Sequence, residues 1–526
     1  MNQQDCLEKQ GIKFNKRKVL LVFLASCVIL LALCQFTLLG SAVSDLQELA
    51  MIPEVRSDLE ALRDLPRYKI HMKMNLDQES PGFQGEETIT FINGEEIILE
   101  NLYLRLYPNG HKTYGNGSLN LIKVLVAGHE VHPVLTVEET VVEVPLQEPL
   151  PPGGQVKLEV EFEGEISKDF AGVGFNYGVY NYTQGVMTLA NWYPILAVYD
   201  DEGWNLDPVY GWGDAVYSDV GLYEVSISTP AKTVVATSGF EVPGKSSQNG
   251  NATTHFYVSG PTRDFFIALS RDFQVLKREV GDTVVNCYFL PGKLAVSRAA
   301  LEVSATALEV FDRLFGLYPY VELDVLVLPL PFTGGVEYPG IILLSDGLFS
   351  DLDDTISRSV VAHEVAHQWW YGVVGSDVID EPWLDEALVT YSSALYIEET
   401  LGKTCFEGVL ADWQERYTRA RAAGTCASIT SPVTSFTSNS DYTPIVYYGG
   451  ALFYHALRER IGDEAFFESL REYYRQFRYK IATTEKLLTL FEEVSGEELD
   501  DLYQEWLFAE GIIILLESKN LLFEEG

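Results

Sequence analysis

The stretch VVAHEVAHQWWYG, residues 360–372, places two histidines four positions apart, with a glutamate directly after the first. Segment 355–373 has apolar residues at helical spacing and no proline, which predicts a helix. Residues four apart lie on one face of a helix, so His363 and His367 would present their rings to a common point. Glu364 would lie on an adjacent face, within reach of a water molecule beside a bound metal ion. The stretch therefore predicts a zinc site, because catalytic zinc takes three protein ligands at about 2.0–2.1 Å and keeps one position for water.

A five-residue HExxH pattern also occurs by chance, and two surface histidines on a helix are the alternative interpretation. The metzincin continuation requires glycine at 370 and histidine at 373, but this chain has Trp370 and Val373. A second predicted helix follows in DEPWLDEALVTYSSALY, and it carries Glu386, 19 positions after His367. Two histidines and a glutamate match the catalytic rather than the structural class of zinc site.

HExxH, an 18-residue gap and a glutamate inside WLDEA together resemble the gluzincin metallopeptidases related to aminopeptidase N and leukotriene hydrolase. The resemblance implies one zinc ion per chain, held by His363, His367 and Glu386, with Glu364 as the general base. The similarity in the order of motifs extends over residues 66–510.

A second motif supports this resemblance. GGVEYPG, residues 334–340, stands where the family carries Gly-x-Met-Glu-Asn. The resemblance implies that Glu337 binds the free α-amino group of the substrate and that Gly334 and Gly335 belong to the substrate-binding segment. Val336 and Tyr338 replace the methionine and asparagine of the motif, which puts the preferred first residue in doubt.

A third motif implies a hydroxyl group that stabilises the transition state. In VYYGG, Tyr447 stands at the tyrosine position of the family's Tyr-x-Lys-Gly motif, and the resemblance makes it the donor to the oxyanion. Tyr448 is the rival for this role, and Gly449 replaces the lysine. Ser393 occupies a position where many members carry an acidic residue that supports the zinc site.

The rest of the chain predicts an α+β multidomain protein. Between 66 and 285, runs that alternate apolar and polar residues lie between Gly, Pro and Asn turns, as in a mostly antiparallel β-sandwich-like domain. After 286 the apolar residues recur with the period of a helix, apart from two short predicted strands around GGVEYPG. The resemblance implies that this part is a thermolysin-like zinc-peptidase domain. The predicted division is a cytoplasmic tail (1–18), a transmembrane anchor (19–40), a juxtamembrane spacer (41–65), an all-β domain (66–285) and a catalytic domain (286–526).

The anchor prediction depends on an apolar segment near the N-terminus. Residues 19–40 carry no charge and a single glutamine, and at about 1.5 Å per residue they can cross a hydrocarbon core of about 30 Å. The basic KRK directly before them predicts a cytoplasmic N-terminus and an extracytoplasmic catalytic domain. A cleaved signal peptide and a lipid anchor at Cys34 are the alternatives.

Composition limits the classes of partner. A net charge of −39 repels phosphate backbones and argues against nucleic acid. The same charge either keeps the protein soluble or attracts cationic substrates. Outside the predicted anchor and tail only Cys287, Cys405 and Cys426 remain, too few for a disulfide framework, and pairing of the last two stays open.

These observations predict a zinc-dependent aminopeptidase, a hydrolase acting on peptides with a free N-terminus. A zinc endopeptidase with the same fold is the first alternative, and an inactive membrane-tethered binding protein is the second. The preferred first residue and the oligomeric state do not follow from the sequence.

Overall fold

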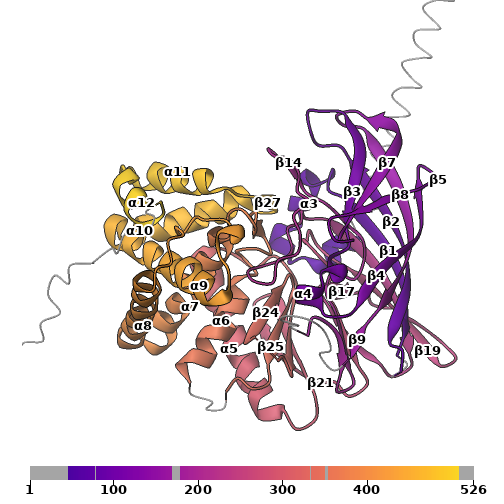
Figure 1. The fold of residues 1–526 in the computed structure, drawn as a ribbon. Coiled ribbons are helices and arrows are strands. Elements are labelled where there is room, and N and C mark those ends of the chain that lie inside the picture. The colour runs from indigo at the N-terminus through magenta and orange to yellow at the C-terminus, as the bar shows by residue number, and fades with distance from the viewer. Residues whose placement is uncertain (1–45, 77–78, 169–177, 332, 350–353, 509–526) are drawn as a thin grey trace, which may run out of the picture.

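The computed structural model describes residues 46–76, 79–168, 178–331, 333–349 and 354–508. A β-rich N-terminal half and a mainly helical C-terminal half lie side by side (Figure 1). This arrangement confirms the predicted α+β multidomain architecture.

The largest sheet of the β-rich half runs in the order β17-β19-β15-β1-β2-β8-β4-β5, with β18 paired to β19. In β1, Tyr68, Ile70 and Met72 point inward and alternate with exposed residues, as a sheet with one face on the core requires. All pairs in this sheet are antiparallel except β1 with β15. Its strands are β1 (Arg67–Asn75), β2 (Gly82–Ile92), β4 (Ser118–Val126), β5 (His129–Val131), β8 (Gln155–Glu165), β15 (Leu222–Pro230), β17 (Phe240–Glu241), β18 (Ser247–Asn249) and β19 (Ala252–Val258).

Two smaller sheets pack against this one around a shared apolar core. One contains β9 (Ser167–Lys168), β10 (Tyr180–Thr183), β11 (Val186–Leu189), β16 (Val234–Thr237) and β20 (Ile267–Ser270). The other contains β3 (Leu99–Arg105), β6 (Val134–Thr136), β7 (Val141–Leu150) and β12 (Ile195–Leu196). The short pair β13 (Tyr199–Asp200) and β14 (Gly203–Trp204) leads into the loop before β15.

The C-terminal half begins with a five-stranded sheet in the order β21-β22-β23-β25-β24. Its strands are β21 (Gln274–Val280), β22 (Thr283–Phe289), β23 (Glu322–Leu328), β24 (Gly335–Tyr338) and β25 (Ile341–Ser345). Alternate residues of β23 belong to different cores: Val325 packs with the helices, and Leu326 packs with the β-rich half. A sheet covered on both faces explains why LDVLVL is a nearly continuous apolar run.

Helices fill the rest of this half: α5 (Leu294–Phe315), α6 (Thr355–Ala366), α7 (Trp383–Leu401), α8 (Lys403–Ala422), α9 (Asn439–Thr443), the π-helix η6 (Pro444–Gly449), α10 (Gly450–Phe477), α11 (Thr484–Ser495) and α12 (Asp500–Trp506). The Asp354 side chain caps α6 by accepting from the Ile356 amide. That helix ends at Ala366, short of the predicted 373. Tight turns follow it, in which the amides of Gln368 and Trp369 donate to carbonyls three residues earlier, and Tyr371 then has a φ of 108°.

The predicted spacer, residues 41–65, is wrong over its described part. Met51 and Ile52 are buried in the core of the helical half, and the Ile52 amide donates to the Pro319 carbonyl. Asp58 forms an ion pair with Arg478. The segment looks polar in the sequence because its few apolar residues are spread over short helical turns rather than a regular face.

The predicted domain boundary at 285/286 falls inside β22, whose sheet continues into the helical half. The alternation of β21 and β22 has the same period as the preceding strands, so the sequence does not reveal the change of sheet. The predicted tail and anchor, residues 1–40, lie outside the described residues. No helix in the described part of the chain combines the length and apolar character needed to cross a bilayer. Cys287, Cys405 and Cys426 are free thiols.

Arg263 joins the two halves. It is 2% exposed, and its guanidinium donates to the carbonyls of Ser218, Tyr371 and Lys480 at 2.8, 2.6 and 2.8 Å. A Cβ at Gly375 would lie 2.1 Å from the guanidinium carbon, so glycine is needed for this approach. Arg263 therefore sets the position of the chain that leaves the histidine helix.

We expect Arg263→Met to destabilise the protein strongly, because it leaves the buried carbonyls of Ser218 and Tyr371 and the partly buried carbonyl of Lys480 without their donor. Each unsatisfied group costs about 1–3 kcal/mol, so the free energy of unfolding should fall by roughly 3–5 kcal/mol. Thermal unfolding of the full chain measures this. Arg278→Met is the control, because Arg278 pairs with Glu302 at the surface, where an ion pair contributes about 1 kcal/mol or less. Equal shifts for the two variants would contradict the linking role of Arg263.

Candidate metal centre

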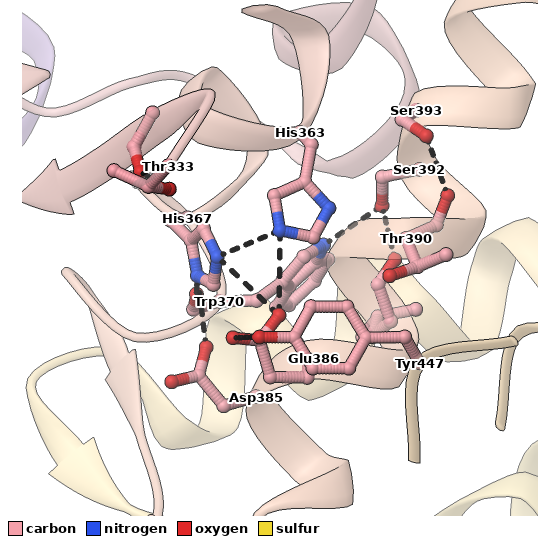
Figure 2. Close-up of polar contacts among 12 residues, drawn as sticks. Thr333, His363, His367, Trp370, Asp385, Glu386, Thr390, Ser392, Ser393 and Tyr447 are labelled. Atoms are coloured by element: carbon pink, nitrogen blue, oxygen red, sulfur yellow. Dashed lines mark hydrogen bonds and ion pairs between the residues drawn. The ribbon is translucent and has the colours of Figure 1, made fainter. Parts of the chain in front are cut away.

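Three predicted ligands meet between α6 and α7. The Nε2 atoms of His363 and His367 are 3.3 Å apart. Oε2 of Glu386 lies 3.3 Å from Nε2 of His363 and 3.8 Å from Nε2 of His367. Figure 2 shows both rings and the carboxylate pointing toward one another.

Two of these three distances match a tetrahedral cation, and the third, 3.8 Å, is a few tenths of an ångström longer. An ion with bonds of about 2.0–2.1 Å holds its ligand atoms about 3.3–3.4 Å apart. Oε2 of Glu386 accepts no hydrogen bond from any residue that the structure describes, although the side chain is almost fully buried. Burial lowers the pKa of His363 and of His367 to about 4, which keeps both rings neutral, the form that binds metals. Three facing acceptors without a proton between them favour a bound cation.

A second donor set, Glu337, Glu364 and His367, also has ligand atoms within 4.8 Å of one another. It would use the same Nε2 atom of His367, because Nδ1 of that ring contacts Asp385 at 2.9 Å. We assign the ion to the set containing His363 and Glu386, because its donor distances match a tetrahedral ion.

Asp385 supports the site and was missed in the sequence. Its Oδ1 accepts from Nδ1 of His367, which leaves the Nε2 lone pair facing the ligand triangle. The available signal was its place directly before Glu386. At the position where many family members carry a supporting acidic residue, the hydroxyl of Ser393 hydrogen-bonds with that of Ser359 and donates to the Thr390 carbonyl.

Glu364 lies beside the ligand triangle in the same cavity and is 5% exposed. Burial, with the nearby charges of Glu386 and Asp214, raises its pKa well above the ordinary value. Its Oε2 has no hydrogen-bond partner among the described residues. A carboxylate that does not ligate the ion and has a raised pKa suits the predicted general base.

Tyr447, rather than Tyr448, faces the metal centre. Its hydroxyl donates to Oε1 of Glu386, and its ring lies parallel to that of His363, with centroids 5.9 Å apart. Tyr448 instead stacks on Trp413 at 6.1 Å. Both tyrosines belong to the π-helix η6, a form that is frequent at functional sites.

Close packing explains why glycine follows these two tyrosines. A Cβ at Gly449, the lysine position of the related motif, would lie 2.7 Å from the Tyr417 ring. A Cβ at the next residue, Gly450, would lie 2.3 Å from Cβ of Ala387. Small residues therefore let η6 approach α7 and α8 closely enough to bring Tyr447 to the centre.

A cavity of about 280 Å³ contains the site and lies between the two halves of the molecule. The helical half contributes His363, Glu364, Glu386 and Tyr447, and the edge strand β24 contributes Glu337. Burial and the neighbouring carboxylates raise the pKa of Glu337 well above its ordinary value. The structure thus brings together all the predicted metal, catalytic and amine-binding side chains. From the β-rich half comes Asp214, which no sequence motif indicated.

The two predicted glycines differ in their surroundings. Gly335 lines the cavity, and a Cβ there would lie 2.5 Å from the Glu364 carboxylate. Gly334 is not among the residues that line the cavity, and a Cβ there would lie 3.0 Å from Cγ1 of Val360, with its next contacts at 3.7 Å and 4.0 Å.

We expect Gly335→Ala to lower kcat about tenfold to a hundredfold without loss of metal, because the methyl group displaces the Glu364 carboxylate by a fraction of an ångström or more. Steady-state kinetics and metal content measure this. Gly334→Ala is the matched control and should change kcat by less than about threefold, since the Val360 side chain can move. The reverse order of effects would show that Gly335 is not needed for the position of Glu364.

The comparisons with known proteins all indicate the same peptidase family. Residues 299–506 match the model of the Peptidase family M1 domain. The chain is similar to aminopeptidase M1-B of Oryza sativa subsp. japonica, 25% identical over 319 residues, which are 58% of this chain and 36% of that protein. It is similar to endoplasmic reticulum aminopeptidase 2 of Homo sapiens, 23% identical over 65% of this chain and 36% of that protein. The chain thus spans about a third of the length of these curated relatives.

The fold is similar to that of the M1 zinc metallopeptidase from Deinococcus radiodurans, with a TM-score of 0.64 and 22% identity over 84% of this chain and 93% of that one. A mutant of that protein has been solved with a Tyr-Ser-Ala substrate, and its TM-score to this chain is 0.63 at 21% identity over 84% of this chain and 94% of that one. The resemblance indicated by the zinc-binding motif is confirmed.

Proposed function

We propose that this chain, whose residues 299–506 form a peptidase family M1 domain, is a zinc-dependent aminopeptidase that removes N-terminal residues from peptides. The observation that carries the proposal is the convergence of His363, His367 and Glu386 on one point, at the wall of a cavity that Glu337 also lines. The names of the relatives and the tripeptide bound to the Deinococcus protein support the reaction and the substrate class.

The proposed reaction gives each side chain one task. His363, His367 and Glu386 would hold the zinc ion, which when bound polarises the scissile carbonyl and lowers the pKa of water. Glu364 takes the proton of the attacking water and passes it to the leaving amine. The Tyr447 hydroxyl, which donates to Glu386 in the free protein, turns its hydrogen bond to the developing oxyanion.

Glu337 determines which peptide bond is cut. Its carboxylate has an oxygen within 4.8 Å of donor atoms of both Glu364 and His367. The α-amino nitrogen and the carbonyl carbon of one residue are about 2.5 Å apart, and one further extended residue adds about 3.3–3.6 Å. Only the first residue fits between a carboxylate this close and the metal centre, so the site favours exopeptidase cleavage.

The open edge of β24 supports binding of an extended peptide. This strand is the last of its sheet and pairs on one side with β25. Its other side faces the cavity through Gly335 and Glu337. An extended substrate can add to such an edge through main-chain hydrogen bonds, which are independent of side-chain identity.

The experiment compares an amino-acid arylamide with its N-acetylated form, with and without a chelator. We expect the free amine to be cleaved in a chelator-sensitive reaction and the acetylated form to resist. Equal cleavage of both would favour the endopeptidase alternative. No cleavage of either by the zinc-loaded protein would favour the inactive binding protein.

We also propose a single-pass membrane location with the catalytic domain outside the cytoplasm. Its support is the uncharged segment 19–40 behind a basic cluster. In this location the net charge of −39 would concentrate cationic N-termini near the cavity, within the screening length of about 8–10 Å. Release of the full chain from membranes by alkaline carbonate would contradict the anchor.

A further inference from the structure

Tyr371 has a backbone conformation that residues other than glycine rarely adopt. Its φ is 108°, and it follows the metal ligand His367 by four positions. A Cβ is strained in this region, so a large residue stays there only where its surroundings hold it, and such strain is concentrated at functional sites. Tyr371 also lines the metal cavity, although the proposed reaction gives it no task.

The β-rich half holds Tyr371 at two points. Nε of Arg263 donates to the Tyr371 carbonyl at 2.6 Å, and the Tyr371 hydroxyl donates to Oδ2 of Asp264 at 3.2 Å. Asp264 is fully buried, and its Oδ2 also accepts from Nδ2 of Asn191 at 3.3 Å. The Tyr114 hydroxyl donates to Oδ1 of Asn191 at 2.7 Å, which fixes that amide in turn. Two consecutive residues of the β-rich half thus hold the backbone and the ring of one residue of the helical half.

The ring that is held in this way packs beside the metal ligand His367. The planes of the two rings are 88° apart and their centroids are 6.4 Å apart, an edge-to-face arrangement that is favourable for aromatic rings. Asp385 and the carbonyl of Trp370 both contact Nδ1 of His367, at 2.9 and 3.3 Å. These two contacts restrain the imidazole at a single atom. A ring packed beside it restrains the orientation of the whole imidazole.

We propose that Tyr371 is a positioning residue for the zinc ligand His367, through which the β-rich half keeps Nε2 of that ring directed at the ligand triangle. Tyr371 acts through its aromatic ring, and Arg263 and Asp264 keep this ring in place against the strain of the backbone. This inference rests on the zinc site of the proposed function and gives the β-rich half a part in metal binding.

Tyr371→Gly in the full chain tests the proposal, because glycine adopts a φ of 108° without strain and only the side chain is lost. We expect the variant to bind zinc about tenfold to a hundredfold more weakly than the unchanged protein, as is typical when a group that orients a metal ligand is removed. Competition with a chromophoric chelator measures zinc affinity without any substrate, and circular dichroism shows that the variant is folded.

Tyr479→Gly is the matched control. Tyr479 is a second buried tyrosine of the helical half, 5% exposed and with a positive φ of 63°, and it is not among the residues that line the cavity. The substitution removes the same ring from the same half of the molecule, but zinc affinity should stay within about threefold, since distant sites act independently. Equal losses of zinc affinity in Tyr371→Gly and Tyr479→Gly would make Tyr371 a packing residue and overturn the proposal.

Two further variants identify the group that acts. Tyr371→Phe keeps the ring beside His367, so zinc affinity should stay within about threefold of the unchanged protein. Tyr371→Leu keeps a large apolar side chain without an aromatic ring, and its zinc affinity should fall close to that of Tyr371→Gly. This pair tests the proposal even if Tyr371→Gly does not fold, because equal affinities of Tyr371→Phe and Tyr371→Leu would overturn it.

The failure of this inference is distinguishable from the failure of the proposed function. An unchanged protein that binds no zinc would refute the proposed function itself. Zinc bound equally well by the unchanged protein and by Tyr371→Gly would refute this inference alone.

Discussion

Replacing Glu364 with glutamine should lower kcat by a factor of about a hundred to ten thousand while zinc stays bound. Glutamine has nearly the same shape but cannot accept the proton of the attacking water, and general-base catalysis contributes about 10²–10⁴ to the rate. The zinc ligands are unchanged, because Glu364 is not one of the donors in the tetrahedral set. Steady-state kinetics with an arylamide and elemental analysis of zinc measure the two quantities.

Glu87→Gln is the matched control for this variant. Glu87 is also buried, at 3% exposed, and neither of its carboxylate oxygens has a hydrogen-bond partner among the described residues. It lies on β2 and does not line the metal cavity. Its replacement should leave kcat unchanged. A fall in kcat of only a few fold for Glu364→Gln would mean that another group takes the proton.

The metal ligands could be predicted because each depends on local geometry or a fixed motif. Four-residue spacing aligns His363 and His367 on any helix, and the helix that carries Glu386 begins where the sequence indicates. The helical pattern predicted after residue 286 corresponds to the helices α5 to α12, and Gly462 breaks the longest of them, α10, with a φ of 80°. Periodicity determines such elements before any tertiary contact is known.

The features that could not be predicted all depend on long-range contacts. Asp214 reaches the cavity only because its loop packs on Val433, more than two hundred positions away. Residues 46–65 look like a polar spacer until Met51 and Ile52 are seen in the core of the helical half. The support for His367 comes from Asp385, which no spacing rule distinguishes from an ordinary residue of a helix N-terminus.

Three residues of the β-rich half help to form the cavity or to hold it in position. Arg263, Trp212 and Asp214 all come from the β-rich half: the first two donate to carbonyls of the helical half, and Asp214 lines the cavity. The cavity is therefore a product of both halves, and the matched M1 domain alone, residues 299–506, lacks part of its wall. The separate β-rich half therefore has a structural reason to be present.

Glu386→Gln should abolish both zinc binding and turnover, and it distinguishes the two possible donor sets. Removing one of three ligands from a site worth about 10–16 kcal/mol costs on the order of 4 kcal/mol, which weakens zinc binding about a thousandfold. The unchanged protein should carry one zinc ion and lose thermal stability when a chelator is added, because a bound ion stabilises only the folded state. The variant should carry no zinc after dialysis, and the chelator should not shift its unfolding temperature.

Asp385→Asn is the graded control, since loss of a residue that orients a ligand weakens metal binding only about tenfold to a hundredfold. If Glu386→Gln kept a full zinc ion with unchanged affinity, the ion would belong to Glu337, Glu364 and His367 instead, and Glu364 could no longer be the base.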